Sequence, residues 1–188
     1  IDPIKDISEI CKERNIWLHI DGSIGGIFAI TSIPIEGLNN INQANSITIN
    51  PQKIIGITKT SSLLLVSNMS TLENTFSTGL PYISSKKNIL NRGEIGIQGS
   101  RPAEVIKLWL GLRFLGLKGI EEILKSSIKR KDFFIKNISK KKFEIYSGPL
   151  HIISFLPKGL RPNDTDVWTQ TKVNELMKNN FMLSRPKF

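Results

Sequence analysis

The stretch SITINPQKIIGITKTSSLLLV (residues 46–66) holds two apolar runs separated by an Asn-Pro-Gln-Lys turn. SITIN (46–50) and SSLLLV (61–66) each have the length and the β-branched or aliphatic character of a buried strand. Lys53 therefore lies in an apolar setting, where desolvation favours the neutral amine that attacks carbonyl groups. A loop lysine that reaches water along its stem is the other interpretation of this segment.

The residues before this stretch predict a helix and another strand. Asp2-Pro3 has the form of an N-cap followed by proline, and apolar residues recur at helical spacing over 3–14. IWLHI (16–20) predicts a buried strand that ends at Asp21. Alternating helices and short buried strands indicate an α/β sheet with parallel members. Ligands bind beyond the carboxyl ends of such strands, where both Asp21 and the 50–53 turn are expected.

The rest of the chain predicts more helices and a hairpin. We expect a short helix at 70–76, a long loop at 77–100, a helix that starts near 101 and another at about 118–138. Two hairpin strands are expected at 143–147 and 150–156, followed by a helix at 164–179 and a last strand at 181–184. The pattern changes to hairpin strands after the helix at about 118–138, and we predict a smaller α+β domain over about 117–188.

The composition indicates a globular protein. Of the 188 residues, 39% are hydrophobic and 22% are charged, which argues against disorder. A single cysteine excludes an internal disulfide, and without a Cys/His cluster we predict no metal site. No apolar run reaches the roughly 18 residues of a membrane span, and the N-terminus lacks a signal-peptide pattern. We therefore expect no membrane partner and a reducing, cytoplasmic location.

The net charge of +10 raises nucleic acid as a partner. The basic residues are spread along the chain, apart from short runs at 129–131 and 140–142, and no RNA-binding aromatic signature accompanies them. We predict no specific nucleic-acid binding and keep a basic interaction module as the non-enzymatic alternative.

Four residues have the functional groups that pyridoxal 5'-phosphate chemistry requires. A lysine that forms a Schiff base with this cofactor needs a carboxylate against the pyridine nitrogen, a polar anchor for the phosphate and a proton donor. Lys53, Asp21, Asn50 and Tyr82 are candidates for these roles, and Tyr82 lies in the long loop.

The segments WLHIDGSIGG (17–26) and NSITINPQKIIGITKTSSLLLV (45–66) together resemble the group II pyridoxal-phosphate-dependent decarboxylases. This family includes the glutamate, aromatic amino acid, cysteine sulfinate and diaminobutyrate decarboxylases, with the pattern W-hydrophobic-H-V-D-A-A followed by N-P-H-K. GEIGIQGSRPAEVIKLWLGLRFLGLKGIEEI (93–123) is similar to the segment after the family's catalytic loop. The resemblance implies fold type I, with 1–116 as the C-terminal part of the cofactor-binding large domain and 117–188 as an incomplete small C-terminal domain.

The resemblance implies a role for each matching residue. Lys53 matches the Schiff-base lysine, Asp21 the aspartate paired with the pyridine nitrogen, and Asn50 an asparagine that helps hold the phosphate. Tyr82 fits the loop tyrosine that returns a proton to the substrate carbon across a dimer interface. His19 matches the histidine that precedes the aspartate.

Three further positions complete the implied site. Arg101 matches an arginine close to the family's active site. Gln52 replaces the usual histidine before the lysine, and it can form hydrogen bonds but cannot titrate. Gly22 replaces an alanine whose methyl packs against the ring in the family, so we expect that face of the cofactor to be held more loosely.

The resemblance implies decarboxylation of an amino acid to its amine and carbon dioxide by a homodimer. We expect this chain to be a fragment that lacks the N-terminal half of such an enzyme and has doubtful activity alone. The alternatives are another fold-type I enzyme, such as an aminotransferase or a sulfur lyase, and an inactive remnant.

Overall fold

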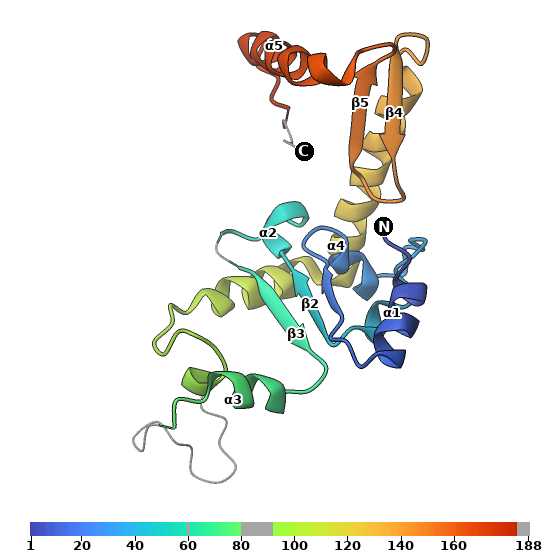
Figure 1. Cartoon of the computed structure of the whole chain (residues 1–188). Helices are drawn as coiled ribbons and strands as arrows, with labels where there is room; N and C mark the ends of the chain where they lie inside the picture. Colours follow the sequence, from blue (N-terminus) through green and yellow to red (C-terminus); the bar gives the residue numbers. More distant parts are fainter. Residues whose placement is uncertain (60, 80–91, 184–188) are drawn as a thin grey trace. The chain divides into compact units, whose positions relative to one another are not determined.

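The computed structural model describes residues 1–59, 61–79 and 92–183 (Figure 1). The chain divides into two compact units, residues 1–128 and 129–188. The division falls inside the long helix α4 (Glu104–Asn137), whereas the sequence places the domain boundary after residue 116. Gly116 itself has φ 59° and ψ 177°, which kinks α4 at the expected boundary. Each unit is described separately.

The described elements follow the expected order. They are α1 (Ile4–Glu13), β1 (His19–Asp21), η1 (Gly26–Ile30), η2 (Ile41–Gln43), β2 (Ser46–Ile49), α2 (Pro51–Ile54), β3 (Leu63–Val66), α3 (Ser70–Phe76), η3 (Arg92–Glu94), α4, β4 (Phe143–Ser147), β5 (Ile153–Pro157), η4 (Pro162–Asp164) and α5 (Thr165–Lys178).

The first unit contains a three-stranded sheet in the order β1-β2-β3. β1 pairs with β2 in parallel, so that His19 faces Ser46 and Asp21 faces Thr48. β2 pairs with β3 antiparallel, which places β2 between the other two strands. The sheet thus has the parallel members expected from the sequence and one antiparallel edge strand.

β1 is shorter than the predicted strand at 16–20, and it begins and ends further along the chain. The Leu18 N–H donates to the side-chain Oδ1 of Asn45 at 2.8 Å instead of to a neighbouring strand. The ladder therefore starts at His19 and includes Asp21. At the N-terminus, Pro3 is the N-cap of α1 without a side-chain cap, so the helix begins one residue later than predicted.

The core of the first unit gathers around η1, β2, the segment after α2, and α4. Phe28, Pro51 and Leu124 are the largest fully buried side chains. The loop after η1 is held to α4, because Glu121 accepts hydrogen bonds from the N–H and hydroxyl of Ser32 at 2.8 and 2.6 Å. These contacts fix the segment that follows η1.

The N-terminal part of α4 leaves apolar side chains exposed. Leu108 is 7% exposed, but Trp109 and Phe114 are 59% and 90% exposed. Lys107 Nζ donates to the Lys59 carbonyl at 2.8 Å, which ties this part of α4 to the segment after α2. The exposed apolar face is an unpartnered surface of the described chain.

The second unit contains the β4–β5 hairpin and α5 (Figure 1). The rings of Phe134 and Phe143 pack on Phe155 with centroid distances of 5.5 and 5.7 Å. The predicted strand at 181–184 is wrong for residues 181–183, which form no strand. The Phe181 N–H instead donates to Leu176 O at 2.9 Å, and the positive φ of Asn180 (63°) closes α5. No helix of the described residues is long and apolar enough to cross a membrane.

Candidate active site

Asp21 and Lys53 lie at the carboxyl ends of two neighbouring parallel strands. Asp21 ends β1, and Lys53 lies in α2, the short helix that directly follows β2. Asn50 precedes α2 and its carbonyl accepts the Lys53 N–H at 3.0 Å, while Pro51 occupies the first helical position. The turn therefore brings the lysine to the edge of the sheet where α/β proteins bind ligands.

The Asp21 carboxylate is held in its ionised form. Hydrogen bonds from the hydroxyl and the N–H of Ser23 lower the pKa of Asp21, and the charges of Lys53 and His19 lower it further. The N–H of Ser23 lies 3.0 Å from Asp21 Oδ1. Hydrogen bonding to the charged form is the dominant cause, and Lys53 lies within electrostatic reach of this carboxylate.

Lys53 is exposed rather than buried. Of the two interpretations of the 46–66 stretch, the desolvated lysine is wrong and the loop lysine that reaches water is observed, because Ile55 and Ile57 turn into the core while Lys53 turns to solvent. Within residues 1–59, 61–79 and 92–183, no hydrogen bond or ion pair holds its amine. The amine is thus free to bond to a ligand.

Asn50 links three segments of the site. Its Oδ1 accepts from the Ser62 hydroxyl at 2.6 Å, just before β3 begins. Its N–H donates to the Ser23 carbonyl at 3.3 Å, in the turn after Asp21. The sequence predicted neither of these contacts: Ser23 stood out only as a replacement of the family's usual alanine, and Ser62 only as part of the predicted strand at 61–66.

Gln52, the residue that precedes Lys53, has a side-chain oxygen that is unpaired among the described residues. Its Oε1 is buried, and no described residue donates a hydrogen bond to it. Buried acceptors are normally paired, so an unpaired one marks a place where a further group can bind. This oxygen occupies the position where the family pattern has histidine.

Gly22 lies against the neighbouring strand. A Cβ atom at this position would lie 2.9 Å from Thr48 O, 3.1 Å from Gly26 Cα and 3.3 Å from Ile47 Cγ2. Such a methyl would meet β2 and the turn after β1. The close approach is a packing reason for glycine at this position, and the looser ring face expected from the missing methyl stays a prediction.

His19 is bonded through both ring nitrogens. Its Nδ1 lies 2.7 Å from the Ser46 hydroxyl, and its Nε2 lies 3.2 Å from the Thr48 hydroxyl. Trp17 Nε1 donates to the same Ser46 oxygen at 2.9 Å. Neither of the two partners of His19 was predicted from the sequence, although the alternation in SITIN places Ser46 and Thr48 on one face of the strand.

Arg101 is engaged by its own loop. Its guanidinium donates from Nε to Gln98 O at 3.0 Å and from Nη2 to Arg92 O at 3.1 Å. In the same segment, the Glu94 carboxylate accepts hydrogen bonds from the hydroxyls of Ser77 and Thr78 at 3.3 and 3.4 Å.

The predicted proton donor Tyr82 lies outside the described residues. The described segments on either side of its loop are joined by the contacts of Glu94.

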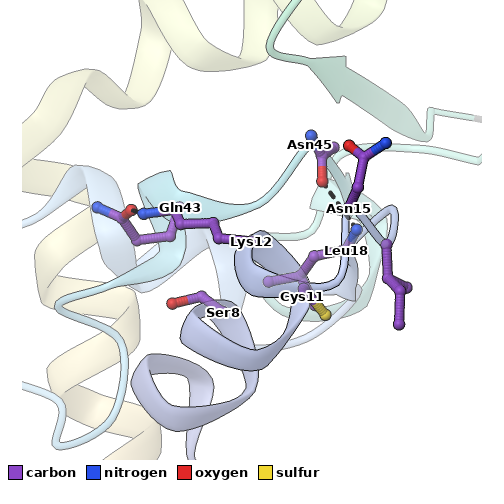
Figure 2. Close-up of a pocket in the computed structure, with 8 residues that line it drawn as sticks. Ser8, Cys11, Lys12, Asn15, Leu18, Gln43 and Asn45 are labelled. Carbon is purple, nitrogen blue, oxygen red and sulfur yellow. Dashed lines mark hydrogen bonds between the residues drawn. The ribbon is translucent and has the colours of Figure 1, made fainter.

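One cavity of about 240 Å³ lies between α1 and η2, and Figure 2 shows its lining side chains. The lining residues are Ser8, Cys11, Lys12, Asn15, Ile16, Leu18, Gln43 and Asn45. Lys12 Nζ donates to Gln43 Oε1, which bridges α1 and η2. Because the lining includes neither Asp21 nor Lys53, this cavity is separate from the candidate site.

An exposed amine and an ionised carboxylate thus lie at the carboxyl edge of an α/β sheet, where such folds bind ligands. Residues 1–155 match the pyridoxal-dependent decarboxylase conserved domain, so the chain belongs to this family. It is 27% identical over 170 residues to the acidic amino acid decarboxylase GADL1 of Mus musculus, covering 85% of this chain and 31% of the relative. The corresponding Xenopus tropicalis protein is 29% identical over 155 residues, with 79% and 30% covered. The chain thus spans about a third of the length of these curated relatives.

Solved structures share the fold. The crystal structure of mouse CSAD superposes with a TM-score of 0.80 at 21% identity, over all of this chain and 42% of that one. Tryptophan decarboxylase of Catharanthus roseus, in complex with L-tryptophan, gives 0.82 at 22% identity, over all of this chain and 41% of its own. The predicted α/β architecture of fold type I is therefore confirmed.

The described residues fit a pyridoxal cofactor on three observations. The Asp21 carboxylate stays ionised, as contact with a protonated pyridine nitrogen requires. The Lys53 amine is exposed next to it. Gln52, the residue before Lys53, has a buried Oε1 without a donor among these residues, so its acceptor is not used by a described partner.

Proposed function

We propose that this chain carries the cofactor lysine and its partner carboxylate in an enzyme that decarboxylates an amino acid to its amine and carbon dioxide. The observation that carries the proposal is the placement of Asp21 and Lys53 at the ends of adjacent parallel strands, within electrostatic reach of one another. Membership of the pyridoxal-dependent decarboxylase family supports it.

Each residue contributes a defined group. Lys53 Nζ would hold the cofactor through its aldehyde, and Asp21, whose low pKa keeps it ionised, would favour a protonated ring nitrogen. When bound, pyridoxal 5'-phosphate supplies a ring that takes up the electron pair released as carbon dioxide leaves. Asn50, whose Oδ1 accepts from Ser62, would offer its amide nitrogen as a donor to the cofactor phosphate.

Tyr82 has the remaining role, donation of a proton to the substrate carbon. The resemblance supports this role and a homodimer in which the tyrosine acts in the partner's site. The exposed apolar face of α4, which includes Trp109 and Phe114, is consistent with a chain that is covered by more protein.

An acidic amino acid is the first substrate class to assay, because the curated relatives are named acidic amino acid decarboxylases. Aspartate and glutamate form the test set, and tryptophan is the comparison substrate, because one of the solved neighbours is a tryptophan decarboxylase. We expect the amine and carbon dioxide in equal amounts from the accepted substrate.

The test compares the full-length enzyme that contains this chain with its Lys53→Ala and Lys59→Ala variants, each supplied with pyridoxal 5'-phosphate. Lys53→Ala should abolish carbon dioxide release, because no other group replaces its amine. Borohydride reduction and peptide mass spectrometry should place the pyridoxyl label on Lys53.

Lys59→Ala is the matched control, since Lys59 lies six residues further on and contributes only its backbone carbonyl to a described contact. It should keep both the activity and the label. Activity retained by Lys53→Ala would refute the proposal.

The same assay separates the alternatives. An aminotransferase yields a keto acid without carbon dioxide, and a sulfur lyase releases sulfide or sulfite. Nucleic-acid binding with a steep salt dependence, together with no pyridoxyl label, would favour the basic interaction module.

A further inference from the structure

The His19 ring spans two successive positions of the neighbouring strand. His19 faces Ser46 in the parallel register, and Thr48 is two residues further along β2, opposite Asp21. His19 and Asp21 alternate with Ile20 and therefore lie on the same face of β1. The ring thus lies beside Asp21 and is bonded to β2 at both ends.

A count of donors and acceptors assigns the protons of this cluster. Trp17 Nε1 can only donate, so it occupies one lone pair of the Ser46 oxygen. Ser46 is only 6% exposed, and its hydroxyl proton needs an acceptor. Among the described residues, the acceptor within reach is His19 Nδ1, at 2.7 Å.

The opposite assignment leaves a buried group unpaired. If Nδ1 carried the proton, Ser46 would accept from both Trp17 and His19, and its own proton would have no described acceptor. With Nδ1 as the acceptor, the neutral ring carries its proton on Nε2 and donates it to Thr48. Thr48 is partly exposed, so water can accept its hydroxyl proton.

We propose that Trp17, Ser46 and Thr48 hold His19 as the Nε2–H tautomer, so that His19 is a positioning residue next to Asp21 and not a proton carrier. Both ring nitrogens are engaged by β2, which leaves neither to exchange a proton with the substrate. The inference rests on the proposed function for Asp21, but the tautomer can be measured without cofactor or substrate.

The first test is the nitrogen spectrum of the His19 ring in the full, cofactor-free chain. Two-bond proton–nitrogen correlations of the neutral ring should show a protonated Nε2 and an unprotonated Nδ1. His19→Gln identifies the signal by removing it. Ser46→Ala should give averaged tautomers, and Ser46→Thr, which keeps the hydroxyl, should restore one.

Ser61→Ala is the matched control for this experiment. Ser61 is 5% exposed, and its hydroxyl has no partner among the described residues. The variant removes an equally buried hydroxyl and should leave the His19 spectrum unchanged. A protonated Nδ1 in the unmodified chain, or an unchanged spectrum in Ser46→Ala, would overturn the proposal.

The second test is the pH profile of kcat/KM in His19→Asn, whose Oδ1 can still accept from Ser46. A positioning role predicts that both limbs of the profile stay in place while the rate falls about fivefold, the size of one hydrogen bond. Loss of one limb would show that His19 carries a proton and would refute the assignment. If no decarboxylation is found at all, the proposed function fails, while the spectrum still decides the tautomer.

Discussion

Gly22→Ala tests whether the glycine after Asp21 is required by the approach of β1 to β2. The nearest atoms to the added methyl are backbone atoms, Thr48 O at 2.9 Å and Gly26 Cα at 3.1 Å. Ordinary contacts begin at 3.4 Å, so the two segments must separate by about 0.5 Å. Backbone atoms in a paired strand cannot rotate away as the end of a side chain can.

The magnitude follows from two opposing terms. Overpacking of one methyl costs about 1–3 kcal/mol of the free energy of unfolding. The backbone at Gly22 is outside the left-handed region, so alanine gains about 0.4–1 kcal/mol by restricting the unfolded chain. The expected net loss is about 1–2 kcal/mol.

The assay is denaturant unfolding of the full chain without cofactor, because ligand binding would add its own stabilisation. Gly99→Ala is the control, since a Cβ there meets no atom within 4 Å and its φ is not in the left-handed region. It should be neutral or slightly stabilising. A Gly22→Ala protein as stable as the control would show that β1 and β2 are not in such close contact.

Three further predictions concern other parts of the chain. Burial and neighbouring cations lower the pKa of His151 below its ordinary 6.5. Because the unfolded chain takes up this proton first, stability should fall as the pH drops below about 6.5, and thermal melts of His151→Phe should lose that dependence. The hydroxyl and N–H of Ser32 hold the pKa of Glu121 at about 2, so the stabilisation by this carboxylate is present above pH 4.5 and is lost on titration towards pH 2. Glu121→Gln should lower the melting temperature at pH 7 and flatten this acid limb; melting temperatures equal to those of the unmodified chain at pH 7 and at acid pH would contradict the prediction. Tyr82→Phe should keep carbon dioxide release but divert product towards side reactions, measured as a fall in the ratio of amine to carbon dioxide; an unchanged ratio would remove the tyrosine from the proton-donor role.

The sequence predicted local elements well where the pattern itself determines them. The strand at 46–50 and the helix at 70–76 are found within one residue, because alternation and helical periodicity express the burial of one face. The antiparallel direction of β3 could not be predicted, since an apolar run such as 61–66 is the same in either direction. The kink at Gly116 depends on a single φ of 59°, which glycine permits but does not require.

Of the candidate site, the sequence by itself determined which residues stand at the strand ends: Asp21 after one strand, and Asn50 with Lys53 after another. The tertiary structure decided what surrounds them, because parallel pairing of β1 and β2 joins residues some 27 positions apart. Only that pairing brings Ser46 and Thr48 to the two nitrogens of His19. It also leaves Lys53 exposed despite its apolar neighbours, since the direction of a side chain in a short turn is set by the backbone and not by the hydrophobicity of the flanking residues.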